Sequence, residues 1–277
     1  MNNIGKEIKA KKKFGQNFLK DQNVLIKIIE SMPNTNNQLI EIGPGLGDLT
    51  KRLLVKRDVV AYEVDEELCV YLRNSFADEI SNNRLILKCG DVLEKFASSE
   101  GLNKEPYDLV ANLPYYIATT IILESLRDPL CKNIMVMVQK EVAQKFAAQT
   151  KDRNFGSLSV LTKSVGNASI LFDVPPQAFE PIPKVDSSIL MISKNSTLND
   201  KLFEDFLRQC FIQPRKTLYK NLSIKFGKDN IQKYFEVLDL SLKLRPHETT
   251  TSQYHQLYKI INKGSLDGRD AREYKSK

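Results

Sequence analysis

Short apolar runs alternate with amphipathic stretches over the first half of this 277-residue chain, and no other feature limits its fold as strongly. The runs have the length of buried strands, whereas the stretches between them show the helical spacing of apolar residues. Alternating strands and helices predict an α/β protein, with a parallel sheet and helices on both faces. The predicted strands are 39–42, 59–63, 85–87, 109–111 and 134–138. The predicted helices are 23–30, with Asp21 as its N-cap, 48–56, 66–76 and 119–127.

The pattern changes in the second half of the chain. Two further strands are predicted at 168–172 and 187–193, with proline-rich turns between them. A polar stretch follows and is typical of a linker, and the remaining segments are helical and basic. We therefore expect two domains, 1–195, which begins with a basic arm over 1–20, and a small helical domain over 201–277.

The net charge of +7 is concentrated at the two ends of the chain. Residues 1–20 carry six lysines and one glutamate, and residues 201–277 carry sixteen basic and nine acidic residues, so the middle is acidic overall. An acidic body with basic ends suits a protein that holds a polyanion such as nucleic acid. Plain solvated surface is the alternative interpretation of the lysine-rich ends.

Cysteine and histidine usage argues against a metal site. The chain has two histidines, and its four cysteines are far apart with no CxxC pair, so we expect reduced, packing cysteines in a cytoplasmic protein. The N-terminus lacks a secretory signal, and no apolar run approaches the ~20 residues of a membrane span, which predicts a soluble protein. The cysteines are Cys69, Cys89, Cys131 and Cys210.

A glycine-rich turn follows the first predicted strand. Its sequence is Glu41-Ile42-Gly43-Pro44-Gly45-Leu46-Gly47, a GxGxG spacing that supports pyrophosphate binding poorly. Glu63 ends the next strand, where a carboxylate can hold ribose hydroxyls, and Asp91 follows the third, where one can accept from an adenine amine. Each signal alone is weak, and Asp91 is equally typical of a helix N-cap. Their order on successive strand ends predicts a site for S-adenosylmethionine rather than NAD.

The fourth predicted strand ends in Asn112-Leu113-Pro114-Tyr115. The carboxamide of Asn112 can hydrogen-bond an amino group, Pro114 stiffens the backbone, and the ring of Tyr115 can stack on a flat heterocycle. This combination suits a site that holds the exocyclic amine of a nucleobase.

With these motifs together, the chain resembles the ribosomal RNA adenine N6-dimethyltransferase family over residues 11–260. That resemblance implies a Rossmann-like class I methyltransferase sheet followed by a small C-terminal helical domain. The further segments that carry it are Phe14–Leu19, Gln139–Ala143, Phe155–Val160, Phe179–Ser187 and Arg215–Leu218.

The resemblance also implies individual roles in the cofactor site. Asn17 and Leu19 would contact the methionine part of S-adenosylmethionine, and Gly43 would line its carboxylate end. Glu63 would hold the ribose, Asp91 the adenine amine, and Asn112 would lie between the methyl group and the substrate amine. Tyr116 is a departure, because the family more often has Asn there, and it leaves the shape of the substrate loop open.

The expected mechanism depends on positioning, because the N6 amine of adenine is a poor nucleophile. Asn112 Oδ1 and the Leu113 carbonyl would accept the two N6 hydrogens of adenine and aim the nitrogen lone pair at the methyl group, with no general base or metal. Asn112, Leu113, Pro114 and Tyr115 form this catalytic segment. Tyr115 is the first candidate to stack on the flipped base and Phe179 the second, with a core aromatic as the alternative interpretation of Phe179.

RNA would be held by the basic ends through phosphate contacts. We expect the leading substrate to be 16S rRNA in an assembling 30S subunit, dimethylated by a monomer. The alternatives are a 23S rRNA methyltransferase of the antibiotic-resistance type, a non-catalytic RNA-binding factor on the same fold, and, least favoured, a small-molecule methyltransferase. The candidate RNA contacts are Lys11, Lys12, Lys13, Arg208, Arg215, Lys216 and Lys220.

Overall fold

The structure is a computed structural model that describes residues 10–98, 101–198 and 200–273, with side chains as far as residue 262. Residues 1–9 of the expected basic arm lie outside the described residues. The chain divides into two compact units: residues up to 144 with 165–197, and residues 145–164 with those from 198 onward.

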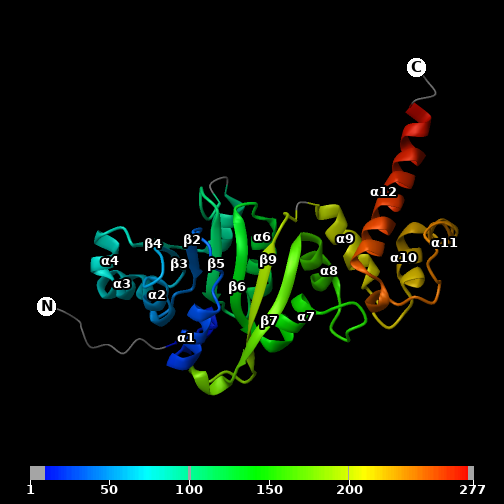
Figure 1. Ribbon diagram of the computed structural model, residues 1–277. Helices are drawn as coiled ribbons and strands as arrows, with labels where there is room; N and C mark the ends of the chain where they lie inside the picture. The colour runs from blue at the N-terminus through cyan, green and yellow to red at the C-terminus, as the bar shows by residue number, and fades with distance from the viewer. Residues whose placement is uncertain (1–9, 99–100, 199, 274–277) are drawn as a thin grey trace. The chain divides into compact units, whose positions relative to one another are not determined.

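The first unit contains a seven-stranded sheet in the order β4-β3-β2-β5-β6-β9-β7 (Figure 1). β2 to β6 run parallel, as predicted, whereas β9 and β7 pair antiparallel at one end. A separate antiparallel pair joins β1 to β8. The strands are β1 Phe18–Leu19, β2 Gln38–Ile42, β3 Val59–Glu63, β4 Leu85–Cys89, β5 Tyr107–Asn112, β6 Cys131–Gln139, β7 Gly166–Val174, β8 Phe179–Glu180 and β9 Ser187–Lys194.

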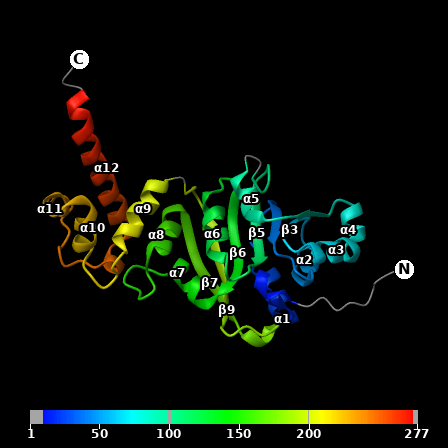
Figure 2. The same cartoon turned by 180° about the vertical axis from the view of Figure 1, so that it is seen from behind.

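Helices cover both faces of this sheet, so the predicted α/β, Rossmann-like class is confirmed. Helix α6 lies behind the sheet in Figure 1 and in front of it in Figure 2. The helices of the first part of the chain are α1 Gln22–Glu30, α2 Asp48–Leu53, α3 Glu66–Ser75, α4 Ala77–Ser81, α5 Val92–Ala97, α6 Ala118–Arg127, α7 Lys140–Ala147 and α8 Ser157–Val165, with 3₁₀ turns η1 Lys12–Phe14 and η2 Pro176–Ala178.

One apolar core cluster joins residues of the sheet to helices α1, α2 and α3. Helix α1 begins at the predicted N-cap, Asp21, whose carboxylate accepts from the backbone N–H of Asn23 and Val24. Its buried side chains pack with those of α2, α3 and alternate strand residues in a single apolar cluster. The burial of that cluster fixes the strand register, because a shift of one residue would turn each strand's apolar side chains to the opposite face.

A buried carboxylate anchors the end of the sheet where the parallel strands begin. Asp108 on β5 is fully buried and forms an ion pair with Arg57, with 3.1 Å between Oδ2 and Nη1. It also accepts from Asn37 Nδ2 at 3.0 Å and Asn133 Nδ2 at 2.8 Å, and from the hydroxyl of Thr35. Its charge is therefore both paired and hydrogen-bonded, as burial of a carboxylate requires.

The expectation of four reduced cysteines is wrong for one pair, since Cys69 and Cys89 form a disulfide. Cys69 lies on α3 and Cys89 ends β4, twenty residues away in sequence. The parallel pairing of β4 with β3 and the packing of α3 on that edge bring the two together, which sequence spacing alone does not reveal. Cys131 and Cys210 are free and buried, as expected of packing residues.

The second unit is helical (Figure 1). Aromatic rings fill part of its interior: Phe203 stacks on His255 at 4.5 Å between ring centroids and meets Tyr258 edge-on at 5.1 Å. Among the described residues, no helix of either unit is long and apolar enough to cross a membrane. Besides α8, the second unit contains α9 Lys201–Cys210, α10 Leu218–Phe226, α11 Lys228–Val237, η3 Pro246–Glu248 and α12 Thr251–Glu273.

The division of the chain differs from the expected one in one segment. Residues 145–164, expected in the first domain, pack with the second unit. Phe155 meets Phe211 edge-on at 6.5 Å between centroids, and the backbone N–H of Lys151 donates to the carbonyl of His247 at 2.8 Å. Such long-range packing leaves no boundary signal in the local sequence.

Candidate cofactor and substrate site

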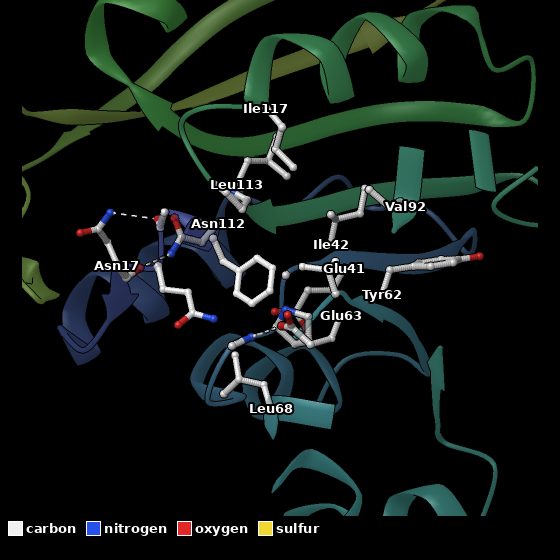
Figure 3. A pocket seen from close by; sticks show the side chains of 18 of the residues that line it. Asn17, Glu41, Ile42, Tyr62, Glu63, Leu68, Val92, Asn112, Leu113 and Ile117 are labelled. Atoms are coloured by element: carbon white, nitrogen blue, oxygen red, sulfur yellow. Dashed lines mark hydrogen bonds between the residues drawn. The ribbon is translucent and has the colours of Figure 1, made fainter. Parts of the chain in front are cut away.

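A pocket opens at the edge of the sheet where β2, β3, β4 and β5 end (Figure 3). Its walls come from five separate segments of the sequence. They are the N-terminal segment 14–19, the glycine turn after β2, the residues after β3 and β4, and the loop 112–117 after β5. The parallel strand order therefore assembles the predicted cofactor residues and the Asn112 segment around one cavity.

The glycine turn needs glycine for two reasons. Gly43, Gly45 and Gly47 have φ of +71°, +60° and +82°, a region that disfavours other residues. At Gly47 a Cβ atom would also lie 2.4 Å from the ring of Phe76, so no side chain fits. At Gly43 the nearest atom to such a Cβ is 3.7 Å away, in Pro114, which leaves this backbone accessible from the pocket.

Glu63 lies at the end of β3 and faces the pocket (Figure 3). Its side chain is 4% exposed and is fixed by two backbone donors, the N–H of Gly45 at 3.2 Å and that of Asp65 at 3.0 Å. Burial raises the pKa of Glu63, while these hydrogen bonds partly offset the effect. A rigid carboxylate at this point suits the predicted hydrogen bonds to two ribose hydroxyl groups.

Glu41 is a pocket residue that the sequence did not single out as a site residue. It is 1% exposed, and the hydroxyl of Thr50 donates to its Oε2 at 2.6 Å. Burial, with a smaller contribution from the charge of Glu63, raises the pKa of Glu41 to about 8, although the Thr50 hydrogen bond lowers it. The sequence feature that could have identified Glu41 is an acidic residue inside an otherwise apolar strand, immediately before the glycine turn.

Asp91 lines the same pocket and also caps a helix. Its Oδ1 accepts from the backbone N–H of Leu93 at 2.8 Å, so it is the N-cap of α5. The side chain is exposed, which leaves room for a ligand beside the cap. The two interpretations of Asp91 are therefore compatible.

The N-terminal segment forms another wall of the pocket. Asn112 Nδ2 donates to the carbonyl of Asn17 at 3.0 Å across 95 residues of sequence, and Figure 3 shows the two side by side. Leu19 pairs with Phe179 between β1 and β8, and the Asn17 side chain donates to the carbonyl of Gly15. Since the Asn112 nitrogen is used in this contact, its Oδ1 is the atom suited to accept from a substrate amine.

The loop after β5 places two tyrosines at the pocket. Tyr115 is half-buried, and its hydroxyl shares a hydrogen bond of 2.6 Å with Ser187 Oγ. Tyr116 is 60% exposed and lies against Gly15, where a Cβ atom would approach its ring to 3.1 Å. Burial, with the nearby charges of Asp91 and Glu63, raises the pKa of Tyr116. The residue that departs from the family pattern therefore lines the candidate pocket.

Phe179 lies in the hydrophobic core. Its side chain is 3% exposed and belongs to the apolar cluster beneath the sheet, as the alternative interpretation held. The pairing of β1 with β8 turns this ring inward, and that pairing links segments about 160 residues apart, beyond the reach of local patterns. In this conformation Phe179 cannot stack on a base.

Lys11 is engaged within the protein. Its Nζ lies 2.7 Å from Asp65 Oδ1 and 2.8 Å from Glu67 Oε2, and Gln16 Nε2 donates to Asp65 Oδ2 at 3.0 Å. Burial alone would raise the pKa of Asp65, but the hydrogen bonds from Lys11 and Gln16 outweigh it and hold that pKa below its usual value. These contacts tie the N-terminal segment to the start of α3, so this lysine has a structural role in addition to any contact with RNA.

The other candidate RNA contacts are on the surface. Lys12 and Lys13 are exposed in η1. In the second unit Arg208 pairs with Asp205 on α9 at 2.7 Å, and the remaining cations lie exposed between α9 and α10 or on α10. No cluster of His, Cys, Asp and Glu side chains in the described part of the chain could hold a metal ion. The exposed cations between α9 and α10 are Arg215 and Lys216, and the one on α10 is Lys220.

Comparison with known proteins gives one consistent match. The family model of the ribosomal RNA adenine dimethylases matches residues 7–263. A "Ribosomal RNA small subunit methyltransferase A" of Sulfurimonas denitrificans is 58% identical over 95% of this chain and 97% of its own, and one of Aliarcobacter butzleri is 52% identical over 93% and 98%.

Solved structures of similar fold agree with this match. A dimethyladenosine transferase from Plasmodium falciparum superposes with a TM-score of 0.74 at 27% identity, over 88% of this chain and 97% of that one. The 23S rRNA methyltransferase ErmE superposes with a TM-score of 0.67 at 24% identity, over 89% of this chain and 100% of that one, and shows the fold alone.

Proposed function

We propose, because the chain belongs to the ribosomal RNA adenine dimethylase family, that it transfers methyl groups from S-adenosylmethionine to N6 of two adjacent adenosines in the 3′-terminal hairpin of 16S rRNA. One observation carries the proposal: the pocket that ends in Asn112 is continuous with the turn and carboxylates suited to the cofactor. The relatives named for the small ribosomal subunit favour 16S rRNA over 23S rRNA as the substrate.

The pocket residues fit S-adenosylmethionine. The backbone around Gly43 is open to the cavity, so the carboxylate end of the methionine part can approach it closely. Glu63 is fixed for the ribose hydroxyls, and Asp91 is exposed for the adenine amine. Asn17 and Leu19 would hold the methionine part. The bound cofactor would supply an electrophilic methyl group on a sulfonium ion.

The protein's own contribution is positioning. Asn112 is held by its Nδ2 bond to Asn17, which directs the carboxamide oxygen for an adenine N6 hydrogen. Leu113 is fixed by its N–H bond to Met137, and Pro114 restrains the turn, so the Leu113 carbonyl would accept the second N6 hydrogen. Both contacts draw the nitrogen towards a tetrahedral geometry with its lone pair facing the methyl group. The bound cofactor would supply the methyl group to this nitrogen, and the N6 proton would leave after the transfer.

The base must leave its stack to reach this pocket. Tyr115 supplies the half-buried ring on which it would lie. Phe179 would contact the base from the other side only after turning out of the core. Stacking by Phe179 therefore requires a conformational change, whereas stacking by Tyr115 does not.

The cations of the second unit would hold the RNA. Arg215 and Lys216 are exposed on the turn before α10, Lys220 lies in the first turn of α10, and Arg208 lies on α9. Contacts of this kind give affinity that falls with salt and carries little sequence preference. Charge reversal at Arg215 and Lys216 should weaken RNA binding and reduce its salt dependence, without changing cofactor affinity. We further propose that the enzyme acts as a cytoplasmic monomer on an assembling 30S subunit.

The test of the catalytic assignment is Asn112→Ala on unmethylated 30S particles. Methyl transfer should fall by at least two orders of magnitude, because the amine loses its positioning, while cofactor affinity falls only modestly. Thermal unfolding of the variant controls for its folding. Near-normal turnover would contradict the assignment.

A further inference from the structure

We propose that Ser187 is a positioning residue for methyl transfer, which acts by fixing the ring of Tyr115 at the substrate side of the pocket. The inference rests on the proposed function, because it deepens the role given to Tyr115 there. Ser187 does not line the pocket itself, so its effect must pass through the tyrosine.

The contact joins a loop at the pocket to a strand inside the sheet. Tyr115 lies on the loop after β5, and its hydroxyl is 2.6 Å from Ser187 Oγ. Ser187 is fully buried and begins β9, where it pairs with Gln139 on β6 and with Val174 on β7. A strand with neighbours on both sides has its backbone hydrogen bonds satisfied, so its side chains are held in place.

The hydrogen bond sets the direction of the ring. A tyrosine ring attached only through its Cβ atom turns about two torsions, and a bond at the hydroxyl fixes the opposite end. The backbone of the loop is itself fixed by the Leu113 N–H bond to Met137 and the Ile117 N–H bond to Pro114. With both ends of Tyr115 held, its ring faces the base at a set angle before RNA binds, which reduces the ordering needed in the transition state.

Burial also favours the neutral form of the Tyr115 phenol. It raises the pKa of Tyr115, although the bond to Ser187 partly offsets the effect. The hydroxyl therefore stays protonated near neutral pH and remains able to donate.

Ser188 provides a matched control on the same strand. It is also fully buried, but adjacent strand residues face opposite sides of a sheet, and its hydroxyl donates to Asp173 Oδ1 at 2.7 Å. Asp173 in turn pairs with Lys140 at 2.6 Å. Ser188→Ala therefore removes a buried strand hydroxyl of the same kind without touching Tyr115.

The experiment is a double-mutant cycle of Ser187→Ala and Tyr115→Phe, with Ser188→Ala as control. We measure kcat and KM for methylation of unmethylated 30S particles, with cofactor affinity measured by calorimetry. Each variant of the cycle should lower kcat/KM for RNA by about 2- to 10-fold, the range expected for one hydrogen bond, without changing cofactor affinity. The double variant should be no worse than the poorer single one, because both remove the same contact. Ser188→Ala should keep the wild-type rate.

A second readout follows the ring directly. In protein with ¹³C-labelled tyrosine rings, the Tyr115 signal is identified by its loss in Tyr115→Phe. Ser187→Ala should shift or broaden that signal, and Ser188→Ala should leave it in place. Additive losses in the cycle, an equal loss in Ser188→Ala, or an unmoved Tyr115 signal in Ser187→Ala would each overturn the proposal. Failure of the proposed function would give a different result. Wild-type protein would then not methylate the particles, while the Tyr115 signal would still show whether Ser187 holds the ring.

Discussion

Buried carboxyl groups at the two ends of the parallel sheet differ in their partners. Where the strands begin, Asp108 is paired with the Arg57 guanidinium and takes hydrogen bonds from two carboxamides. Where they end, Glu41 and Glu63 are also buried, but neither forms an ion pair among the described residues, and their donors are a hydroxyl and backbone N–H groups. Loss of one member of a buried ion pair destabilises the fold, whereas an unpaired carboxylate at a pocket retains the capacity to bind a ligand.

The largest expected effect is at the stabilising end. Asp108→Ala leaves the half-buried charge of Arg57 without its partner, so the free energy of unfolding should fall by about 3–5 kcal/mol. Chemical denaturation measures this loss directly. The activity of the folded fraction should remain near that of wild type, and a selective loss of cofactor binding would show that the two ends are not distinct.

Glu63→Gln should show the opposite pattern. The neutral amide keeps the shape but loses the charge-assisted hydrogen bonds to ribose hydroxyls, so cofactor affinity should fall by about 10- to 100-fold. The amide nitrogen cannot accept from a backbone N–H, so one of the two bonds from Gly45 and Asp65 is lost. This loss offsets the gain from removing an unpaired buried charge, so the free energy of unfolding should change by no more than about 1 kcal/mol. Calorimetric titration with S-adenosylmethionine, together with denaturation, separates the two effects. A destabilised variant with normal cofactor affinity would contradict the comparison.

Glu41 predicts how stability depends on pH. Its pKa is about 8 when folded, above its value of 4.5 when unfolded, so the folded protein holds a proton that the unfolded chain releases between these values. Stability from this group is complete below pH 4.5 and is lost as pH rises towards 8, with a slope of up to about 1.4 kcal/mol per pH unit. Glu41→Gln should flatten this decline. Parallel pH profiles of the two proteins would contradict the assignment.

The smallest expected effect concerns the N-terminal wall of the pocket. Lys11→Ala removes the ion pairs to Asp65 and Glu67, so the segment that carries Asn17 is held less firmly. Cofactor affinity should fall by a few-fold, whereas Lys12→Ala, at an exposed neighbouring position, should weaken RNA binding alone. Equal effects of both variants on the cofactor would argue against this structural role for Lys11.

The sequence predicted what depends on local pattern. The strands of the first half, the N-cap at Asp21 and the residues at successive strand ends all follow from the alternation of apolar and polar residues together with the parallel order. The roles of individual contacts, including those of Asp91 and Asn112, remain predictions until a ligand-bound measurement tests them.

What sequence could not predict depends on contacts between distant segments. Phe179 is buried because β8 pairs with β1, and Cys89 meets Cys69 because α3 packs beside β4. Lys11 belongs to a basic cluster in sequence, yet two carboxylates after β3 hold it in the structure. In each case the partner lies at least 20 residues away and no local pattern marks it.

One measurement tests the central claim most directly. The protein is incubated with methyl-labelled S-adenosylmethionine and a mixture of unmethylated 30S particles and 23S rRNA, and the modified nucleosides are then mapped. The account predicts N6-dimethyladenosine at two adjacent positions near the 3′ end of 16S rRNA, lost in Asn112→Ala. Label in 23S rRNA alone, or in neither RNA, would contradict it.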